Sequence, residues 1–294
     1  MKTSMKRRIA LGAPLLAVLG GLFWLDWHLQ CRICATQTAW PLAAVFVPLM
    51  ILGVHEMAHI CAGAGVRILK LSASAGALVV GSIPFWWQWM DRQYHGYADH
   101  HLSGFGLLVV LSVLMIVMLV EQMIRDRAAD AARQIACTLL TVMYLGLGGA
   151  MILAVRMAYG VPALVLFVAA VKFTDMGAYF VGSAIGRHKL IPWLSPGKTW
   201  EGLVGGIAAG VGTSLLAGWL LRVGLGAGQL AIFGVLMALA GQLGDLCESL
   251  LKRAGNVKDS GTLVPEFGGV LDMLDSLLLA APFAYAALTW MTAG

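Results

Sequence analysis

The chain has 294 residues, of which 60% are hydrophobic and 12% are charged, and its net charge at pH 7 is +5. With a mean hydropathy of +0.83 it is far too apolar for a water-soluble domain. Long unbroken apolar runs favour helices over barrel strands, so we expect an all-α polytopic membrane protein. We expect no nucleic-acid partner.

The first apolar run covers residues 9–25 and follows the basic segment MKTSMKRR. It has the charge pattern of a signal peptide, but Trp24, Asp26 and Trp27 stand where a small-residue cleavage site would be. We therefore expect a retained first span with a cytosolic N-terminus. Further spans are expected at 41–65, 71–90, 104–121, 135–155, 161–183, 203–221, 229–247 and 270–291. Residues 1–294 then form a single membrane domain of about nine helices.

Two short motifs in the N-terminal third resemble metal sites. Cys31 and Cys34 form a lone C-x-x-C pair without the second pair that completes a zinc site. His55, Glu56 and His59 form HEMAH, which has the spacing of a zinc protease. Such a protease needs a third ligand from a later span, and the sequence offers none beyond the LDMLD segment. We expect both histidines to be incidental.

Basic residues are distributed unevenly between alternate loops. Fifteen lie in loops on the side of the N-terminus, and four lie on the other side. The four are Arg32, Arg92, Arg156 and Arg222. Because cytosolic loops of membrane proteins carry the excess of Lys and Arg, the segments 186–201 and 252–269 are expected to face the cytosol.

Lys172 and Asp175 lie three residues apart near the end of the span at 161–183. A charge at membrane depth is costly and usually faces a partner or a water-filled cavity, so the pair is a candidate site. The following loop contains SPGKTWEG, which ends like a phosphate-binding loop, but Pro192 replaces its first glycine. The residues of this loop that remain candidates for binding phosphate are Ser195, Lys198 and Thr199.

The segment from Gly244 to Ser276 holds six of the chain's 15 acidic residues. They are Asp245, Glu248, Asp259, Glu266, Asp272 and Asp275. Asp245, Ser249 and Lys252 share one face of a helix that continues past residue 247, and Asp272 and Asp275 share a face of the next helix. Carboxylates are ligands for magnesium and basic side chains neutralise phosphate, so the segment predicts a site for a metal-bound nucleotide.

From Ser249 to Asp275 the sequence reads SLLKRAGNVKDSGTLVPEFGGVLDMLD and resembles the signature of the phosphatidate cytidylyltransferases, the CDP-diacylglycerol synthases. The matching positions are Ser249, Lys252, Arg253, Lys258, Asp259, Gly261, Pro265, Gly268, Gly269, Asp272 and Asp275. Phe267 and Met273 depart from the signature, which usually has His and Arg there. The segment 175–202 is similar to the family's other characteristic segment, so residues 170–294 carry the resemblance. A glutamate also often occurs in the family near the position of Glu56.

The resemblance implies transfer of CMP from CTP to phosphatidate, giving CDP-diacylglycerol and pyrophosphate in phospholipid biosynthesis. It implies a bacterial inner-membrane enzyme with a cytosolic active site. The catalytic residues it suggests are Asp245, Asp272, Lys252, Lys258, Asp259 and Asp275. Asp245 and Asp272 are assigned to Mg²⁺, with room for a second cation. The residues expected to bind substrate are Ser195, Lys198, Thr199, Ser249, Arg253, Gly268, Gly269 and Asp175. Expected partners are CTP, phosphatidate and the bilayer, and a homodimer is allowed for.

Three alternatives stay open. A CTP-dependent polyprenol or phytol kinase would release CDP in place of pyrophosphate. An intramembrane zinc protease would contain zinc at HEMAH, and a transporter would use Lys172 and Asp175 as a buried pair. Assays of pyrophosphate release, zinc content and CTP binding distinguish these functions.

Overall fold

The computed structural model describes residues 20–26, 28, 40–93, 100–125, 128, 130–261 and 268–293. Its described part is mostly helical, which confirms the all-α class. Several features of the sequence lie outside the described residues: the basic N-terminal segment, most of the first expected span, the Cys31 and Cys34 pair, and Phe267.

The α-helices are α2 (Trp40–Gly63), α3 (Lys70–Gln93), α4 (His100–Ile124), α5 (Ala131–Thr141), α6 (Gly148–Ile185), α7 (Trp200–Leu220), α8 (Ala227–Ala254) and α9 (Val270–Thr292). A π-helix, η1 (Val142–Leu147), connects α5 to α6. Among the described residues, six helical segments are long and apolar enough to cross a membrane. α3 coincides with the expected span at 71–90 but is not one of the six. The expected number of nine is therefore not confirmed.

One of the six segments covers 55 residues, from Ala131 to Ile185. It is broken at Gly160, whose φ of 81° and ψ of 180° are not helical, and Pro162 follows two residues later. Proline fits the first turn of a helix because it has no backbone N–H to satisfy there. The break lies between the spans expected at 135–155 and 161–183, so the sequence placed this boundary correctly.

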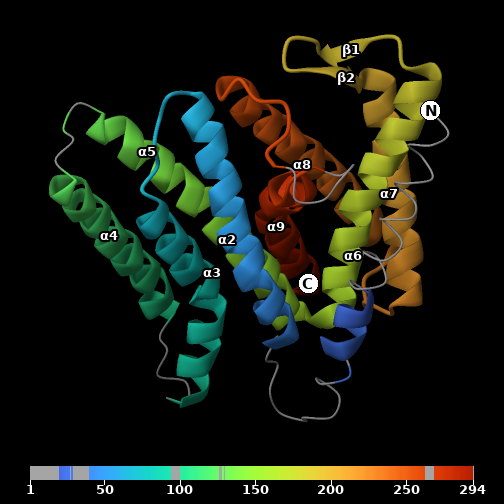
Figure 1. Ribbon diagram of the computed structural model, residues 1–294. Helices are drawn as coiled ribbons and strands as arrows, with labels where there is room; N and C mark the ends of the chain where they lie inside the picture. The colour runs from blue at the N-terminus through green and yellow to red at the C-terminus, as the bar shows by residue number, and fades with distance from the viewer. Residues whose placement is uncertain are drawn as a thin grey trace.

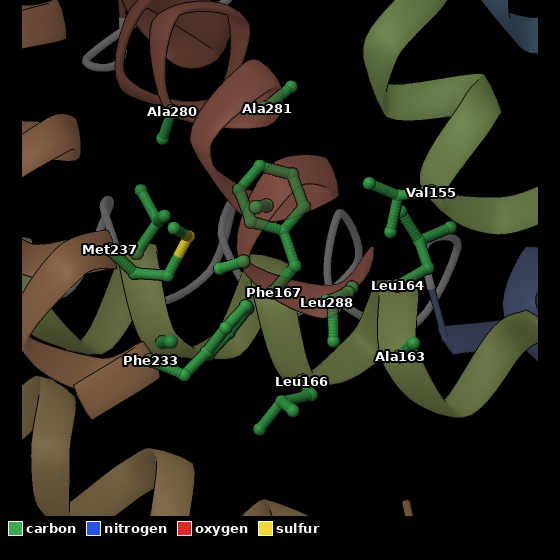
Figure 2. Close-up of a cluster of buried hydrophobic side chains, with 14 of the residues drawn as sticks. Val155, Ala163, Leu164, Leu166, Phe167, Phe233, Met237, Ala280, Ala281 and Leu288 are labelled. Carbon is green, nitrogen blue, oxygen red and sulfur yellow. The ribbon is translucent and has the colours of Figure 1, made fainter. Parts of the chain in front are cut away.

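α9 lies between two groups of helices, with α6, α7 and α8 on one side and α2, α3, α4 and α5 on the other (Figure 1). Its buried face is rich in alanine, including Ala280 and Ala281, which are both fully buried. Figure 2 shows these residues beside Phe167 of α6 and Met237 of α8. Small residues let helix backbones approach closely, which holds α6, α8 and α9 around one core.

The loop expected at 186–201 contains a short antiparallel hairpin, which was not predicted from the sequence. Strand β1 (Lys189–Ile191) pairs with β2 (Ser195–Thr199), and Lys189 lies opposite Thr199. The hairpin lies at one end of the bundle, beyond α6 and α7 (Figure 1). It carries Lys198 toward α8.

Arg156 corrects the count of basic residues in loops. Its side chain is fully buried in α6 and forms an ion pair with Asp26. It is therefore not a loop residue and does not belong in the outer set. Removing it makes the bias toward the N-terminal side larger.

Candidate active site

Three carboxylates meet where the second half of α8 packs against the start of α9. Oxygen atoms of Asp245, Glu248 and Asp275 all lie within 4.8 Å of one another. Glu248 and Asp275 are 1% and 4% exposed, and Glu248 Oε1 is buried without a hydrogen-bond partner. Buried like charges at this separation repel, so the group needs protons, a bound cation or positively charged side chains to offset its charge. Three hard oxygen donors fit Mg²⁺.

The backbones of α8 and α9 approach closely at this point because residue 244 is glycine. A Cβ atom on Gly244 would lie 2.7 Å from the carbonyl oxygen of Asp275 and 2.8 Å from the Cα of Ser276. Any larger residue would push the helices apart. Gly244 therefore determines how close Asp245 and Asp275 can come.

Lys252 connects the two helices beside the acidic group. Its Nζ lies 2.6 Å from Glu248 Oε2 and 2.6 Å from Asp272 Oδ1. The other Asp272 oxygen, Oδ2, accepts hydrogen bonds from Ser260 N–H at 3.1 Å, Ser260 Oγ at 2.7 Å and Gly269 N–H at 2.8 Å. Asp272 therefore ties the α8–α9 connection to the start of α9.

The arrangement differs from the pairing that the sequence suggested. Asp245 and Asp272 were expected to share a cation, but Asp272 is bonded to Lys252, Ser260 and Gly269. Asp275, one turn further along α9, lies beside Asp245 instead. Glu248 was not among the expected site residues. Its spacing of three residues from Asp245 and four from Lys252 was the signal that could have found it.

Two more lysines border the acidic group. Lys198 Nζ, at the end of the hairpin, lies 2.8 Å from Asp245 Oδ2 and donates to Gln242 Oε1 at 3.0 Å. Lys172 of α6 donates to the Met273 carbonyl oxygen at 2.9 Å, and its Nζ lies 3.8 Å from Asp175 Oδ2. The fold thus brings together three of the expected site residues, Lys198, Asp175 and Asp245. Lys172 and Gln242 lie in the same region.

The other expected residues of α8 and the hairpin lie around this centre. Ser249 Oγ is 3.5 Å from Asp245 Oδ1, and Arg253 Nε donates to the Leu194 carbonyl oxygen at 3.4 Å. Thr199 is buried and its hydroxyl accepts from Gly202 N–H at 3.1 Å, which makes it the N-cap of α7. Ser195 begins β2 and is partly buried.

The remaining expected residues lie in or beside the connection from α8 to α9. Lys258 and Asp259 are exposed in the turn that follows α8. Gly268 has a φ of +87°, and a Cβ there would lie 2.5 Å from Asp272 Oδ2, so only glycine fits. Gly269 is the N-cap of α9.

Glu56 of α2 also contributes to this region. Its two carboxylate oxygens accept from Val270 N–H at 2.8 Å and Leu271 N–H at 2.7 Å, and Oε2 lies 3.1 Å from Ser260 Oγ. The first N–H groups of a helix lack partners within it, so Glu56 supplies acceptors to the start of α9. The sequence pointed to Glu56 through HEMAH and the family position, but not to this contact.

Comparison with known proteins identifies the family of this chain. A model of the cytidylyltransferase family matches residues 16–291, nearly the whole chain. The chain belongs to the cytidylyltransferase family. It is also 30% identical over 254 residues to the phosphatidate cytidylyltransferase of Bacillus subtilis, which covers 83% of this chain and 92% of the relative. The resemblance drawn from the motifs is therefore confirmed, and this cytidylyltransferase-family chain is an integral membrane protein.

Two other relatives match over shorter segments. The phosphatidate cytidylyltransferase of Brucella suis is 44% identical over 127 residues, which is 43% of this chain and 47% of the relative. The phosphatidate cytidylyltransferase of Staphylococcus haemolyticus is 34% identical over 175 residues, which is 60% of this chain and 65% of the relative. These two alignments span less than two thirds of the relatives' own length.

Proposed function

We propose that this chain transfers the cytidylyl group of CTP to phosphatidate, giving CDP-diacylglycerol and pyrophosphate. The observation that carries the proposal is the grouping of Asp245, Glu248 and Asp275 within 4.8 Å, with Lys198 and Lys252 bonded to its edge. Such a centre suits a metal-bound triphosphate. The relatives named phosphatidate cytidylyltransferase indicate which acceptor to expect.

The residues assigned to a divalent cation, magnesium, are Asp245, Glu248 and Asp275. This set replaces the Asp245 and Asp272 pair, because Asp275 is grouped with Asp245 and Glu248 within 4.8 Å, whereas Asp272 bonds to Lys252, Ser260 and Gly269. When bound there, magnesium would offset the carboxylate charges and neutralise charge on the phosphates. A second cation remains a prediction.

Lys198 and Lys252 would bind phosphate oxygens of the substrates. Each now donates to carboxylates at 2.6 to 2.8 Å, and a phosphate provides acceptors of the same kind. Arg253 is exposed at the end of α8, and Lys258 is exposed in the following turn, so both are accessible to the outer phosphates of CTP.

The reaction itself needs no protein nucleophile. A phosphate oxygen of the lipid attacks the α-phosphorus of CTP, a new P–O bond forms, and the bond to the β-phosphate oxygen breaks to release pyrophosphate. Two negatively charged substrates must be brought into line, so the side chains act by positioning and by neutralising charge. We place this site on the cytosolic side of a bacterial inner membrane, where CTP is available and acyl chains can remain in the bilayer.

The test uses purified protein in lipid nanodiscs with phosphatidate, magnesium and CTP labelled on either the α- or the γ-phosphate. We expect the α-label in the lipid product and one pyrophosphate released for each lipid formed, and we expect no product from Asp245→Asn. Transfer of the γ-label to lipid would indicate a kinase and overturn the proposal. No labelled lipid from either nucleotide would also overturn it.

A further inference from the structure

A pocket lined partly by basic side chains is formed by residues that the proposed reaction does not use. It has a volume of about 490 Å³ and lies at the end of α2, the α2–α3 connection and the end of α4. Its lining residues are His55, Ala58, His59, Ala62, Arg67, Ile68, Lys70 and Arg125. This lining includes three fixed positive charges and two imidazoles but no carboxylate.

The pocket separates the residues of HEMAH into two roles. Glu56 is buried and bonds to the start of α9, whereas His55 and His59 are exposed and line the pocket. The two histidines lie one turn apart on α2, with Arg67 and Lys70 among their neighbours in the pocket wall. Positive neighbours disfavour a metal cation and favour an anion.

Arg125 is held in place by its own helix. Its Nη2 donates to Glu121 Oε1 at 2.6 Å, and the other Glu121 oxygen accepts from Ser72 Oγ. A guanidinium has five N–H donors, so bonding to Glu121 through Nη2 does not exhaust its capacity to bind a phosphate. The pocket thus combines one oriented arginine with Arg67 and Lys70.

The surroundings of the pocket suit the surface of a bilayer. Leu71, next to Lys70, is 75% exposed, and Met123 and Ile124, next to Arg125, are 78% and 79% exposed. In a membrane protein such side chains contact lipid, while lysine and arginine extend toward the headgroups. A phosphate group attached to a lipid could therefore enter this pocket from the side.

We propose that this pocket binds a phosphate group, presented by a lipid headgroup or as free phosphate, at a site separate from the acidic centre. Arginine and lysine form charge-assisted hydrogen bonds with phosphate oxygens, and the histidines add N–H donors. Ala58, Ala62 and Ile68 would contact the apolar part of a lipid ligand. Binding at this site requires neither CTP nor turnover, so it can be tested independently of the proposed reaction.

The test measures how fast diethyl pyrocarbonate modifies individual histidines of the full chain in detergent, without CTP, by mass spectrometry. The probes are dioctanoyl phosphatidate, inorganic phosphate and dioctanoylglycerol. At ten times its Kd, a bound probe should slow modification of His55 and His59 about tenfold. His188, whose side chain is 79% exposed outside the pocket, is the internal control and should react unchanged.

Protection by dioctanoyl phosphatidate alone would identify a lipid ligand, and equal protection by inorganic phosphate would identify free phosphate. Arg67→Ala should raise the Kd for protection about tenfold, since one charge-assisted contact is lost. Arg125→Ala is a second variant with the same expectation. Arg133→Ala is the matched control, because Arg133 is 64% exposed, pairs with Asp130 at 3.7 Å and lies outside the pocket. The proposal is overturned if dioctanoylglycerol protects His55 and His59 as well as the phosphate-containing probes do, or if no probe protects them. It is also overturned if Arg67→Ala and Arg125→Ala both leave the Kd for protection unchanged.

Discussion

The Glu56 carboxylate accepts a hydrogen bond from the Leu271 backbone N–H at 2.7 Å, across 215 residues of sequence. Its other oxygen accepts from the Val270 N–H, and a Cβ on Gly261 or Gly269 would lie only 2.6 or 2.4 Å from the carboxylate. A buried side chain of α2 thus helps to fix the start of α9, the helix that carries Asp272 and Asp275.

Glu56→Ala is expected to destabilise the protein by about 2–4 kcal/mol, because two buried N–H donors at the start of α9 lose their acceptor. The measurement is the apparent Tm of purified protein in detergent, together with turnover. Asp130→Ala is the control: Asp130 is 57% exposed and its ion pair with Arg133 spans 3.7 Å, so its loss should cost less than about 1 kcal/mol. Equal Tm values for the two variants would show that the Glu56 contact does not stabilise α9.

Gly244→Ala should reduce turnover more than it reduces stability. The added methyl would meet the Asp275 carbonyl oxygen at 2.7 Å, so α8 must shift away from α9 and separate Asp245 from Asp275. A misplacement of about 1 Å can cost on the order of a hundredfold in rate. The readouts are pyrophosphate release and the apparent Tm.

The matched control for this change is Gly228→Ala, in the first turn of the same helix. A Cβ on Gly228 would have nothing within 4 Å, and alanine favours helix, so this variant should keep its turnover. Normal turnover in Gly244→Ala would mean that the helix contact does not control the geometry of the site.

The local features of the site were predictable from the sequence. Helical spacing placed Asp245, Ser249 and Lys252 on α8, and the break between two spans fell near Gly160. Charge and glycine patterns identified the segments that meet at the site. These features depend on residues close in sequence, so periodicity and turn chemistry are sufficient to find them.

Contacts between distant segments could not be predicted in the same way. Spacing and the family motif together favoured Asp272 over Asp275 as the partner of Asp245 at a cation. The choice depends on Ser260 and Gly269, which bond to Asp272, and on Gly244, which brings α8 against Asp275. Helical periodicity says which residues share a face but not which neighbour that face meets. The hairpin at Lys189–Thr199 was missed because its strands are only three and five residues long.

The orientation of the chain is tested by labelling introduced cysteines from outside intact cells. Lys189→Cys, in the hairpin, and Ala254→Cys, at the end of α8, should be protected, because the basic residues place both segments in the cytosol. Gly228→Cys, with open space around its Cβ at the opposite end of α8, should be labelled. The inverse pattern would reverse the orientation and put the acidic centre outside the cell.

The last prediction separates the two possible partners of Asp245. If Asp245, Glu248 and Asp275 hold magnesium, Asp275→Asn removes a ligand charge with little change of shape. Turnover should then fall on the order of a thousandfold, and the magnesium concentration for half-maximal rate should rise. Asp272→Asn instead breaks the ion pair with Lys252 and weakens the bonds from Ser260 and Gly269. It should lower the apparent Tm and the rate but leave the magnesium requirement unchanged.

Pyrophosphate release against magnesium concentration decides between the two partners of Asp245, with the exposed Asp130→Asn as control. A raised magnesium requirement in Asp272→Asn, with a normal one in Asp275→Asn, would restore the pairing of Asp245 with Asp272 and show that our assignment is wrong.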